Sequence, residues 1–356
     1  MARVLIGCSI LWLALGMSSG AGHGDEPLPF SGDLRLRFNH FDAPAKVARE
    51  KFSVRLRLGT EKKVNEAVTF GARIATGGNN PISANGTLTD FLGRPEFRVD
   101  RAYLNWKPQP HTTVTAGKFA NPFQRTEMIW DEDVCPGGLV VTTDLSPSGR
   151  SSIKVRNVAG LLTVFEVKEG SDLLLYADQV QWDLGRGRNA ALAYYAYQSP
   201  QSLAKAYDKG TFTSNDTNRR NQGAFVSEGF RMVNLLLQYR LPLKTEASVT
   251  ATLDWVKNTR ADDQDQGFRF LVEASQGKGV GAWQATLGYT DVEADATLAA
   301  FTDSNWSGTD CRGFKVGYQK TVAPNTDIAL TYFAGQRPFA GIGTAHNLYL
   351  DFKTKF

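Results

Sequence analysis

The sequence predicts an all-β protein, a transmembrane antiparallel β-barrel of about 16 strands. Three observations predict it. Stretches of about ten residues alternate between apolar and polar side chains, as tilted membrane-spanning strands do. The links between them are alternately short and long. Beyond the N-terminal segment, no apolar run approaches the ~20 residues of a spanning helix. The composition, 42% hydrophobic and 21% charged, agrees, because alternating strands look ordinary on average.

The N-terminal segment has the features of a secretory signal peptide. Arg3 provides a positive start, residues 4–15 are apolar, and Ser19-Gly20-Ala21 offers small residues for cleavage. We therefore expect a cleaved signal peptide at residues 1–21 and a single barrel domain at 22–356. An ordinary N-terminal helix is the alternative.

The alternation itself separates two kinds of face. In residues 51–59 one face is apolar and the other polar, the apolar positions being Phe52, Val54, Leu56 and Leu58. A soluble β-sandwich would also alternate, so further features must decide. Arg, Lys and Asp occur in mid-strand on the polar face, which suits a water-filled lumen, and aromatic residues lie near strand ends on the apolar face. Short turns on one side and long loops on the other also favour short periplasmic turns and long extracellular loops.

Counting the strands tests this interpretation. Fifteen stretches alternate, at 32–40, 51–60, 67–76, 97–107, 112–119, 159–167, 172–182, 189–198, 229–241, 246–258, 267–278, 282–293, 312–321, 327–335 and 345–356. Bacterial single-chain barrels have even numbers, and fifteen strands would place the long segment 199–228 among the periplasmic turns. A further strand at 150–156, followed by a tight turn near Asn157, corrects both faults. A barrel of sixteen strands leaves an aqueous channel.

Two resemblances add to this prediction. The stretch Asn347 to Phe356 resembles the final strand of outer-membrane barrels, with Phe352 and Phe356 at the positions of the signal that the barrel-assembly machinery reads. Several short blocks resemble the putative-porin family of Gram-negative outer-membrane β-barrels, which is distantly similar to the phosphate-selective porins O and P. These blocks are Asp100 to Leu104, Gly117-Lys118, Asn121 to Phe123, Tyr289 to Asp295, Asp303 to Trp306 and Gly313 to Lys315. The resemblance implies a pore of about this size and a homotrimer, and it leaves the solute open.

Basic residues gather on the polar face of the first five predicted strands. They are Arg35, Arg37, Arg55, Arg57, Arg73, Arg101 and Lys118. A Lys or Arg on the lipid face costs ~2–4 kcal/mol at the bilayer midplane, so these side chains should line the lumen as one basic wall. Such a wall can attract anions through water without holding them tightly, which predicts a preference for anions. Alternatively, the arginines pair with lumenal carboxylates and stiffen the wall.

A long acidic loop follows the fifth predicted strand, at about residues 120–149. We expect Asp131, Glu132 and Asp133 to line a constriction opposite the basic wall, with a transverse electric field between the two. A solvated surface loop is the alternative. Cys135 lies in this loop and Cys311 in a later one, and a disulfide between them is possible in an oxidising compartment. Their spacing matches no zinc site, and we expect no metal or cofactor.

Taken together, the sequence predicts an outer-membrane porin, a water-filled channel for passive diffusion of small hydrophilic or anionic solutes. A closed structural or adhesive barrel and a membrane-embedded hydrolase are the alternatives. No Gly-x-Ser-x-Gly motif occurs and the four histidines are scattered, so we expect no enzyme. The partners expected are outer-membrane lipid and lipopolysaccharide, besides the barrel-assembly machinery. A net charge of +4 without a Lys/Arg run argues against nucleic acid.

Overall fold

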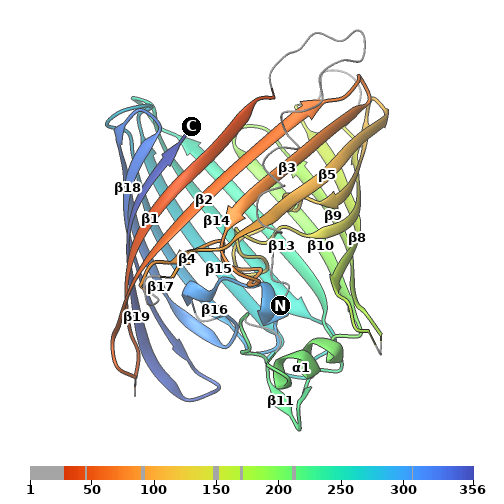
Figure 1. Ribbon diagram of the computed structural model, residues 1–356, viewed down its shortest axis with the longest axis vertical. Coiled ribbons are helices and arrows are strands. Elements are labelled where there is room, and N and C mark those ends of the chain that lie inside the picture. The colour runs from red at the N-terminus through yellow and green to blue at the C-terminus, as the bar shows by residue number, and fades with distance from the viewer. Residues whose placement is uncertain are drawn as a thin grey trace, which may run out of the picture.

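The computed structural model describes residues 28–44, 46–89, 93–146, 152–168, 171–210, 214–306 and 308–356. These residues form one closed antiparallel barrel of strongly tilted strands (Figure 1). The predicted signal peptide at residues 1–21 lies outside the described residues.

Sixteen strands make up the barrel wall. They are β1 (Phe30–Asp42), β2 (Arg49–Lys63), β3 (Val68–Thr76), β5 (Phe97–Gln109), β6 (Thr112–Lys118), β7 (Gly137–Asp144), β8 (Lys154–Phe165), β9 (Leu173–Asp183), β10 (Arg188–Gln198), β13 (Arg231–Pro242), β14 (Ala247–Asn258), β15 (Gln266–Gln276), β16 (Trp283–Val292), β17 (Cys311–Ala323), β18 (Thr326–Arg337) and β19 (Ile342–Lys355). The short β4 (Gly86–Thr87) extends the pairing of β2. The predicted fold class and strand number are confirmed.

One strand lies elsewhere than predicted. Residues 137–144 form β7, and residues 154–165 run as one uninterrupted strand, so the predicted strand at 150–156 with a turn at Asn157 is wrong. The glycine pair Gly137-Gly138 resembles a loop signal in the sequence. In the structure, Gly138 has φ of 137° and a Cβ there would lie 2.3 Å from the carbonyl oxygen of Leu161. Glycine is therefore needed for close strand pairing at this position.

The links between strands are sorted by length. One end of the barrel has tight turns such as 110–111 and 324–325, and the other end has loop 2 (77–96), loop 3 (119–136), loop 5 (199–230) and loop 7 (293–310). Loop 5 contains helix α1 (Gln201–Asp208) with the β11 (Arg220–Asn221) and β12 (Ala224–Phe225) hairpin, and loop 7 contains η1 (Ala299–Phe301) and η2 (Ser304–Trp306). None of the helices in the described part of the chain has the length and apolar character needed to span a membrane.

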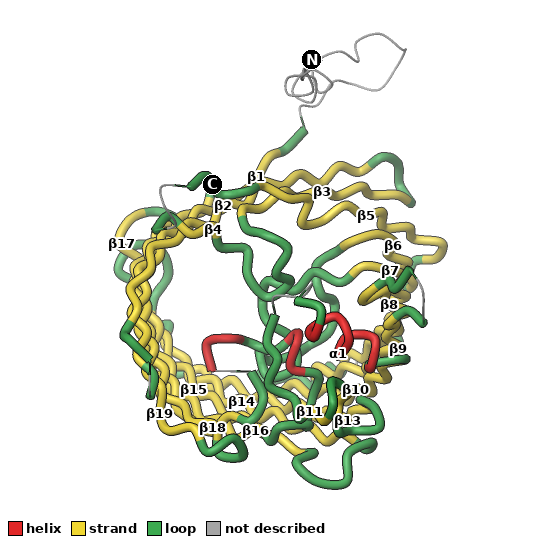
Figure 2. The backbone as a smooth tube through the Cα atoms, turned by 60° about the horizontal axis from the view of Figure 1, so that its bottom comes forward, coloured by secondary structure: helices red, strands yellow, loops and turns green. Residues whose placement is uncertain are grey.

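The interior of the barrel is not polar throughout. An apolar cluster fills it beside β8–β10 and β13, where strand residues such as Leu175, Tyr195 and Met232 meet loop residues such as Trp130 and Phe301. The rings of Trp130 and Phe301 stack with centroids 5.5 Å apart. Figure 2, which looks toward the loop end, shows loops and α1 gathered over this side. Loops 3, 5 and 7 therefore pack together against this side of the wall, where the interior is apolar and filled.

The barrel closes where its first and last strands pair. The register joins Asp33 to Lys355 and continues to Asp42 and His346. Beyond it, the backbone N–H of Gly32 donates to the carbonyl of Phe356 at 2.8 Å, and that of Phe356 donates back at 3.1 Å. The Phe356 ring lies so close to Gly32 that a Cβ there would be 2.7 Å from it. Phe352 and Phe356 are both exposed.

Candidate functional site

The predicted basic wall forms on neighbouring strands inside the barrel. Arg35 and Arg37 come from β1, Arg55 and Arg57 from β2, and Arg73 from β3. Arg35 stands directly opposite Arg55 in the strand pair, and both are buried, at 4% and 6% exposure. Like charges placed opposite each other repel. The wall therefore requires counter-charges from elsewhere in the fold.

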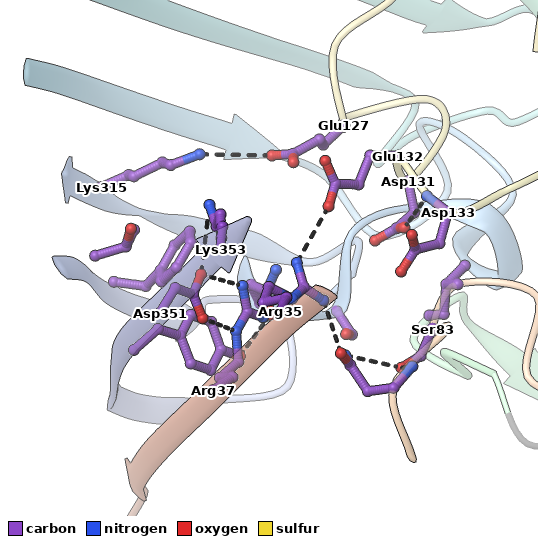
Figure 3. A pocket seen from close by; sticks show the side chains of 17 residues that line it. Arg35, Arg37, Ser83, Glu127, Asp131, Glu132, Asp133, Lys315, Asp351 and Lys353 are labelled. Atoms are coloured by element: carbon purple, nitrogen blue, oxygen red, sulfur yellow. Dashed lines mark hydrogen bonds and ion pairs between the residues drawn. The ribbon is translucent and has the colours of Figure 1, made fainter. Parts of the chain in front are cut away.

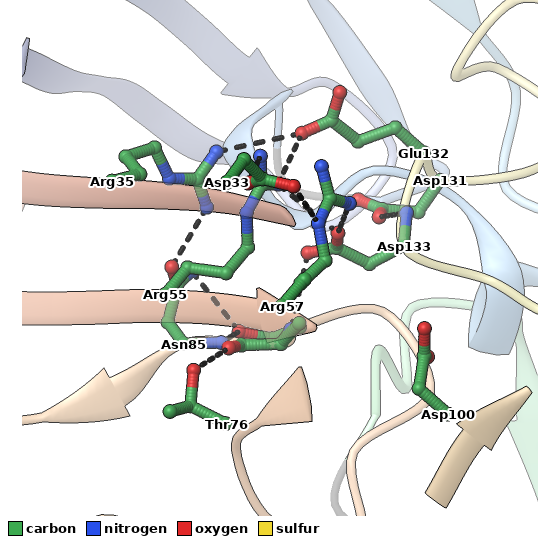
Figure 4. Close-up of polar contacts among 12 residues, drawn as sticks. Asp33, Arg35, Arg55, Arg57, Thr76, Asn85, Asp100, Asp131, Glu132 and Asp133 are labelled. Atoms are coloured by element: carbon green, nitrogen blue, oxygen red, sulfur yellow. Dashed lines mark hydrogen bonds and ion pairs between the residues drawn. The ribbon is translucent and has the colours of Figure 1, made fainter. Parts of the chain in front are cut away.

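Loop 3 supplies two of these counter-charges from its acidic tip (Figure 4). Glu132 accepts from Arg55 at 3.1 Å and from Arg35 at 3.4 Å. Asp133 accepts from Arg55 at 3.2 Å and lies 3.6 Å from Arg57. Asp133 also accepts the backbone N–H of Ala84 in loop 2 at 3.1 Å. The tip thus rests on the basic wall and ties loops 2 and 3 to it.

The charge environment keeps Glu132 ionised. Burial opposes ionisation of this carboxyl, but the guanidinium groups of Arg55 and Arg35 outweigh it and lower the pKa of Glu132 to about 2. Its side chain is still 57% exposed. Glu132 therefore favours its ionised form beside the arginines.

Carboxylates of the wall itself complete the pairing. Asp33 accepts from Arg57 at 2.6 Å and from Arg55 at 3.2 Å. Asp351 on β19 accepts from Arg37 through both oxygens, at 2.6 and 2.8 Å. Sequence analysis did not single out Asp33 and Asp351. Both alternate onto the same inward face as their arginines, which was a signal available in the pattern.

The remaining basic residues hold the returning arm of loop 3. Arg73 pairs with Asp100. Arg101 donates to the Cys135 sulfur at 3.3 Å, and Lys118 donates to the Cys135 carbonyl at 2.9 Å. Each of the seven predicted wall residues thus contacts either loop 3 or a carboxylate of the barrel wall.

The disulfide that the sequence allows between Cys135 and Cys311 does not form in the structure. Cys135 and Cys311 are both buried with free thiols. Cys135 lies in loop 3 against the guanidinium groups of Arg73 and Arg101. Cys311 is the first residue of β17 and packs near Trp306, Phe333 and Tyr349. Loops 3 and 7 are joined by backbone hydrogen bonds instead.

Loop 3 is also anchored on the opposite wall. The amide of Gln179 on β9 donates to the Gln124 carbonyl at 2.8 Å and accepts the Gln124 N–H at 2.7 Å. Asp254 on β14, which is fully buried, accepts the N–H of Thr126 at 3.2 Å and a bond from Asn234. The loop consequently crosses the barrel interior from one wall to the other. Sequence analysis missed these anchors, because single polar residues at inward strand positions do not reveal their partner.

Loop 7 supports loop 3 from the loop end of the barrel. The backbone N–H of Asp131 donates to the Phe301 carbonyl at 2.7 Å, and that of Asp303 donates to the Glu127 carbonyl at 3.0 Å. Burial and the charge of Asp303 raise the pKa of Asp131, and burial and the charge of Glu127 raise the pKa of Asp303. Two buried carboxyl groups at one loop junction therefore favour the protonated state.

Beside loop 3 the structure leaves two recesses lined by charges of both signs. One recess of about 190 Å³ has basic residues on β1, β17 and β19 facing carboxylates of loop 3 (Figure 3); among its lining residues are Arg35, Arg37, Lys315, Lys353, Glu127 and Glu132. A second recess of about 600 Å³ lies toward β10 and β13–β15. Glu127, Glu132 and Lys315 line both. Lys315 lies 3.7 Å from Glu127. The predicted acidic residues Asp131, Glu132 and Asp133 all line the first of these charged recesses.

Across the described residues, no group of three or more His, Cys, Asp and Glu side chains is arranged to hold a metal ion.

These features define a class: a sixteen-stranded outer-membrane barrel with an inward-folded loop bordering a charged recess. Residues 43–253 and 228–356 match the family described as "putative porin". The chain belongs to this porin family, and the family and fold indicate a channel of the bacterial outer membrane.

Solved porin structures share the fold. OprB of Pseudomonas putida aligns with a TM-score of 0.61 at 12% identity, over 92% of this chain and 94% of that chain. OmpF of Salmonella typhi, in complex with daunomycin, aligns with a TM-score of 0.56 at 10% identity, over 92% and 97%. A triple mutant of the porin from Rhodopseudomonas blastica gives 0.53 at 12% identity, over 93% and 100%. No curated protein matches the sequence significantly.

Proposed function

We propose that this protein is a passive diffusion channel for small hydrophilic solutes, exported with a cleaved signal peptide and assembled as a homotrimer. The observation that carries the proposal is the position of loop 3. This loop folds into the barrel and leaves space beside it that is lined by charges of both signs. Ordered charges facing each other across a wet passage favour polar over apolar solutes. A dense apolar plug across the whole lumen would have excluded such a passage.

The pairing of the basic wall bears on ion selectivity. Each of Arg35, Arg37, Arg55 and Arg57 has a carboxylate within 3.4 Å. A paired guanidinium attracts a passing anion less than a free one does. We therefore propose that any preference for anions is weak and that the passage selects solutes mainly by size and dipole. The similarity to phosphate-selective porins remains a prediction.

The other proposed partners are the barrel-assembly machinery and the lipids of the outer membrane. The exposed ring of Phe356 ends the last strand, and we expect it, with Phe352, to be read by the barrel-assembly machinery. Outer-membrane lipid and lipopolysaccharide are the expected surroundings of the outer wall.

Planar-bilayer recording of the refolded protein tests the function. We expect discrete open-channel conductance and, under a KCl gradient, a reversal potential close to zero. Strong selectivity for either ion would contradict the proposed weak selectivity, but it would still support a channel. A folded barrel without conductance would overturn the channel and favour a closed structural or adhesive barrel, or a membrane-embedded hydrolase.

A further inference from the structure

One carboxylate faces outward from the middle of the barrel wall. Asp178 lies at the centre of β9 and is exposed, as is Tyr176, whereas the alternating residues Ala177 and Gln179 are buried in the interior. Another charged pair on the outer face, Asp291 with Arg312, lies beside the loop ends of β16 and β17. Asp178 differs because it lies within the band that acyl chains would cover.

A second polar group accompanies this carboxylate. Asn157 on β8 donates from Nδ2 to Asp178 Oδ1 at 2.8 Å, and this bond is itself exposed. Ionisable residues that contact lipid inside the membrane are costly and rare, because hydrocarbon offers no partners to their remaining donors and acceptors. This polar pair therefore marks a part of the wall that is poorly suited to acyl chains.

The wall is hollowed at the same place. A recess of about 380 Å³ lies over β7–β10, with the small residues Ala159 and Gly160 in it and Leu139, Leu161, Tyr176 and Tyr194 around it. Asp178 also lines it, opposite Ala159 on one side and Tyr194 on the other. Small residues let membrane-embedded proteins approach closely, since their backbones can come into contact.

We propose that this outer-wall patch, defined as Asn157, Ala159, Leu161, Tyr176, Asp178 and Tyr194, is the surface through which the barrel binds a second copy of itself. A partner must present a protein wall at the same depth in the membrane, and a second barrel does so. The patch also offers hydroxyl donors on its tyrosines and acceptors on Asp178, so it can form hydrogen bonds with polar groups of a neighbouring barrel. The polar pair of Asn157 and Asp178 is then covered by protein and no longer contacts acyl chains.

The inference rests on the proposed homotrimer and names its interface. Substituting Ala159→Trp fills the recess from within the patch, and Ala251→Trp on the outer face of β14 is the matched control. We expect the wild type and Ala251→Trp to remain oligomers in mild detergent by light scattering after gel filtration. Ala159→Trp should elute as a folded monomer that still conducts.

A second measurement applies if Ala159→Trp does not fold. Nitroxide labels on Leu161→Cys in the patch and Val316→Cys on β17 are compared for oxygen accessibility in lipid vesicles, the native cysteines being buried. We expect several-fold lower accessibility at position 161. Equal accessibility, or an oligomeric Ala159→Trp, would overturn the interface. A monomeric wild type would overturn the homotrimer with it, whereas missing conductance in an oligomer would overturn only the channel.

Discussion

At the scale of the residue, the basic wall shows how a cluster of like charges is made stable. Arg35 and Arg55 face each other across a strand pair with their side chains almost fully buried. Removing one partner from a buried ion pair leaves an uncompensated charge, which is far more costly than losing an exposed pair. Glu132 contacts both arginines and is the shared counter-charge that also faces the passage.

Substituting Glu132→Gln should make the channel favour chloride. The amide keeps the size of the side chain but removes the negative charge, so the guanidinium groups of Arg35 and Arg55 are less neutralised. The reversal potential under a KCl gradient should shift toward the chloride equilibrium potential. Glu50→Gln, at an exposed position near the start of β2, is the control and should leave the potential unchanged. An unchanged potential in Glu132→Gln would show that this carboxylate does not border the conducting path.

At the scale of the element, loop 3 contacts the barrel wall and loop 7 at many points along its length. Hydrogen bonds from β9, β14 and loop 7, ion pairs from β1 and β2, and the stacked Trp130 and Phe301 rings fix it at successive points. Each buried polar group left without a partner would cost ~1–3 kcal/mol, so the contacts act together to hold one conformation. The junction of loops 3 and 7 is the exception, because Asp131 and Asp303 place two buried carboxyl groups there.

The contact between loops 3 and 7 should weaken as the pH rises. The pKa of Asp303 is raised by burial and by Glu127 above its usual 3.8. The folded state therefore keeps a proton that the unfolded chain releases above that value, and stability falls with increasing pH. Thermal unfolding and current noise should show a less stable, noisier channel at mildly alkaline than at mildly acidic pH.

Asp303→Asn tests whether this carboxyl causes the change. Its amide oxygen can still accept the Asn305 N–H, while its charge no longer varies with pH. The variant should lose much of the pH dependence, whereas Asp262→Asn, at an exposed position between β14 and β15, should retain it. A pH dependence that is the same in both variants would assign the effect to other groups.

At the scale of the whole molecule, the barrel depends on closure between β1 and β19. Gly32 pairs with Phe356 at this closure. A side chain at position 32 would collide with the Phe356 ring and with the Arg57 carbonyl oxygen, which would lie 2.5 Å from its Cβ. Closure leaves no free edge, which is what allows strands to lie in a membrane.

Gly32→Val should lower the thermal stability of the folded barrel. The collision with the backbone of Arg57 forces β1 away from β2, and the Phe356 ring must also move, so the strands beside the closure lose hydrogen bonds. Semi-native electrophoresis after heating should show unfolding at a temperature several degrees lower than for the wild type. Gly78→Val is the control, since no atom lies within 4 Å of a Cβ there. Equal stability of the two variants would show that the closure tolerates a larger residue.

The sequence by itself determined the barrel, its strand number and the place of the basic wall. Period-two alternation depends only on neighbouring residues, and a misplaced arginine on the lipid face is costly, so these features are encoded locally. The tertiary structure alone decided that the wall is paired, that loops 3, 5 and 7 fill one side of the interior, that Gly137-Gly138 begins a strand and that Cys135 and Cys311 stay apart. It also showed that Asp178 faces outward. Each of these depends on contacts between residues far apart in the chain, which no local pattern specifies.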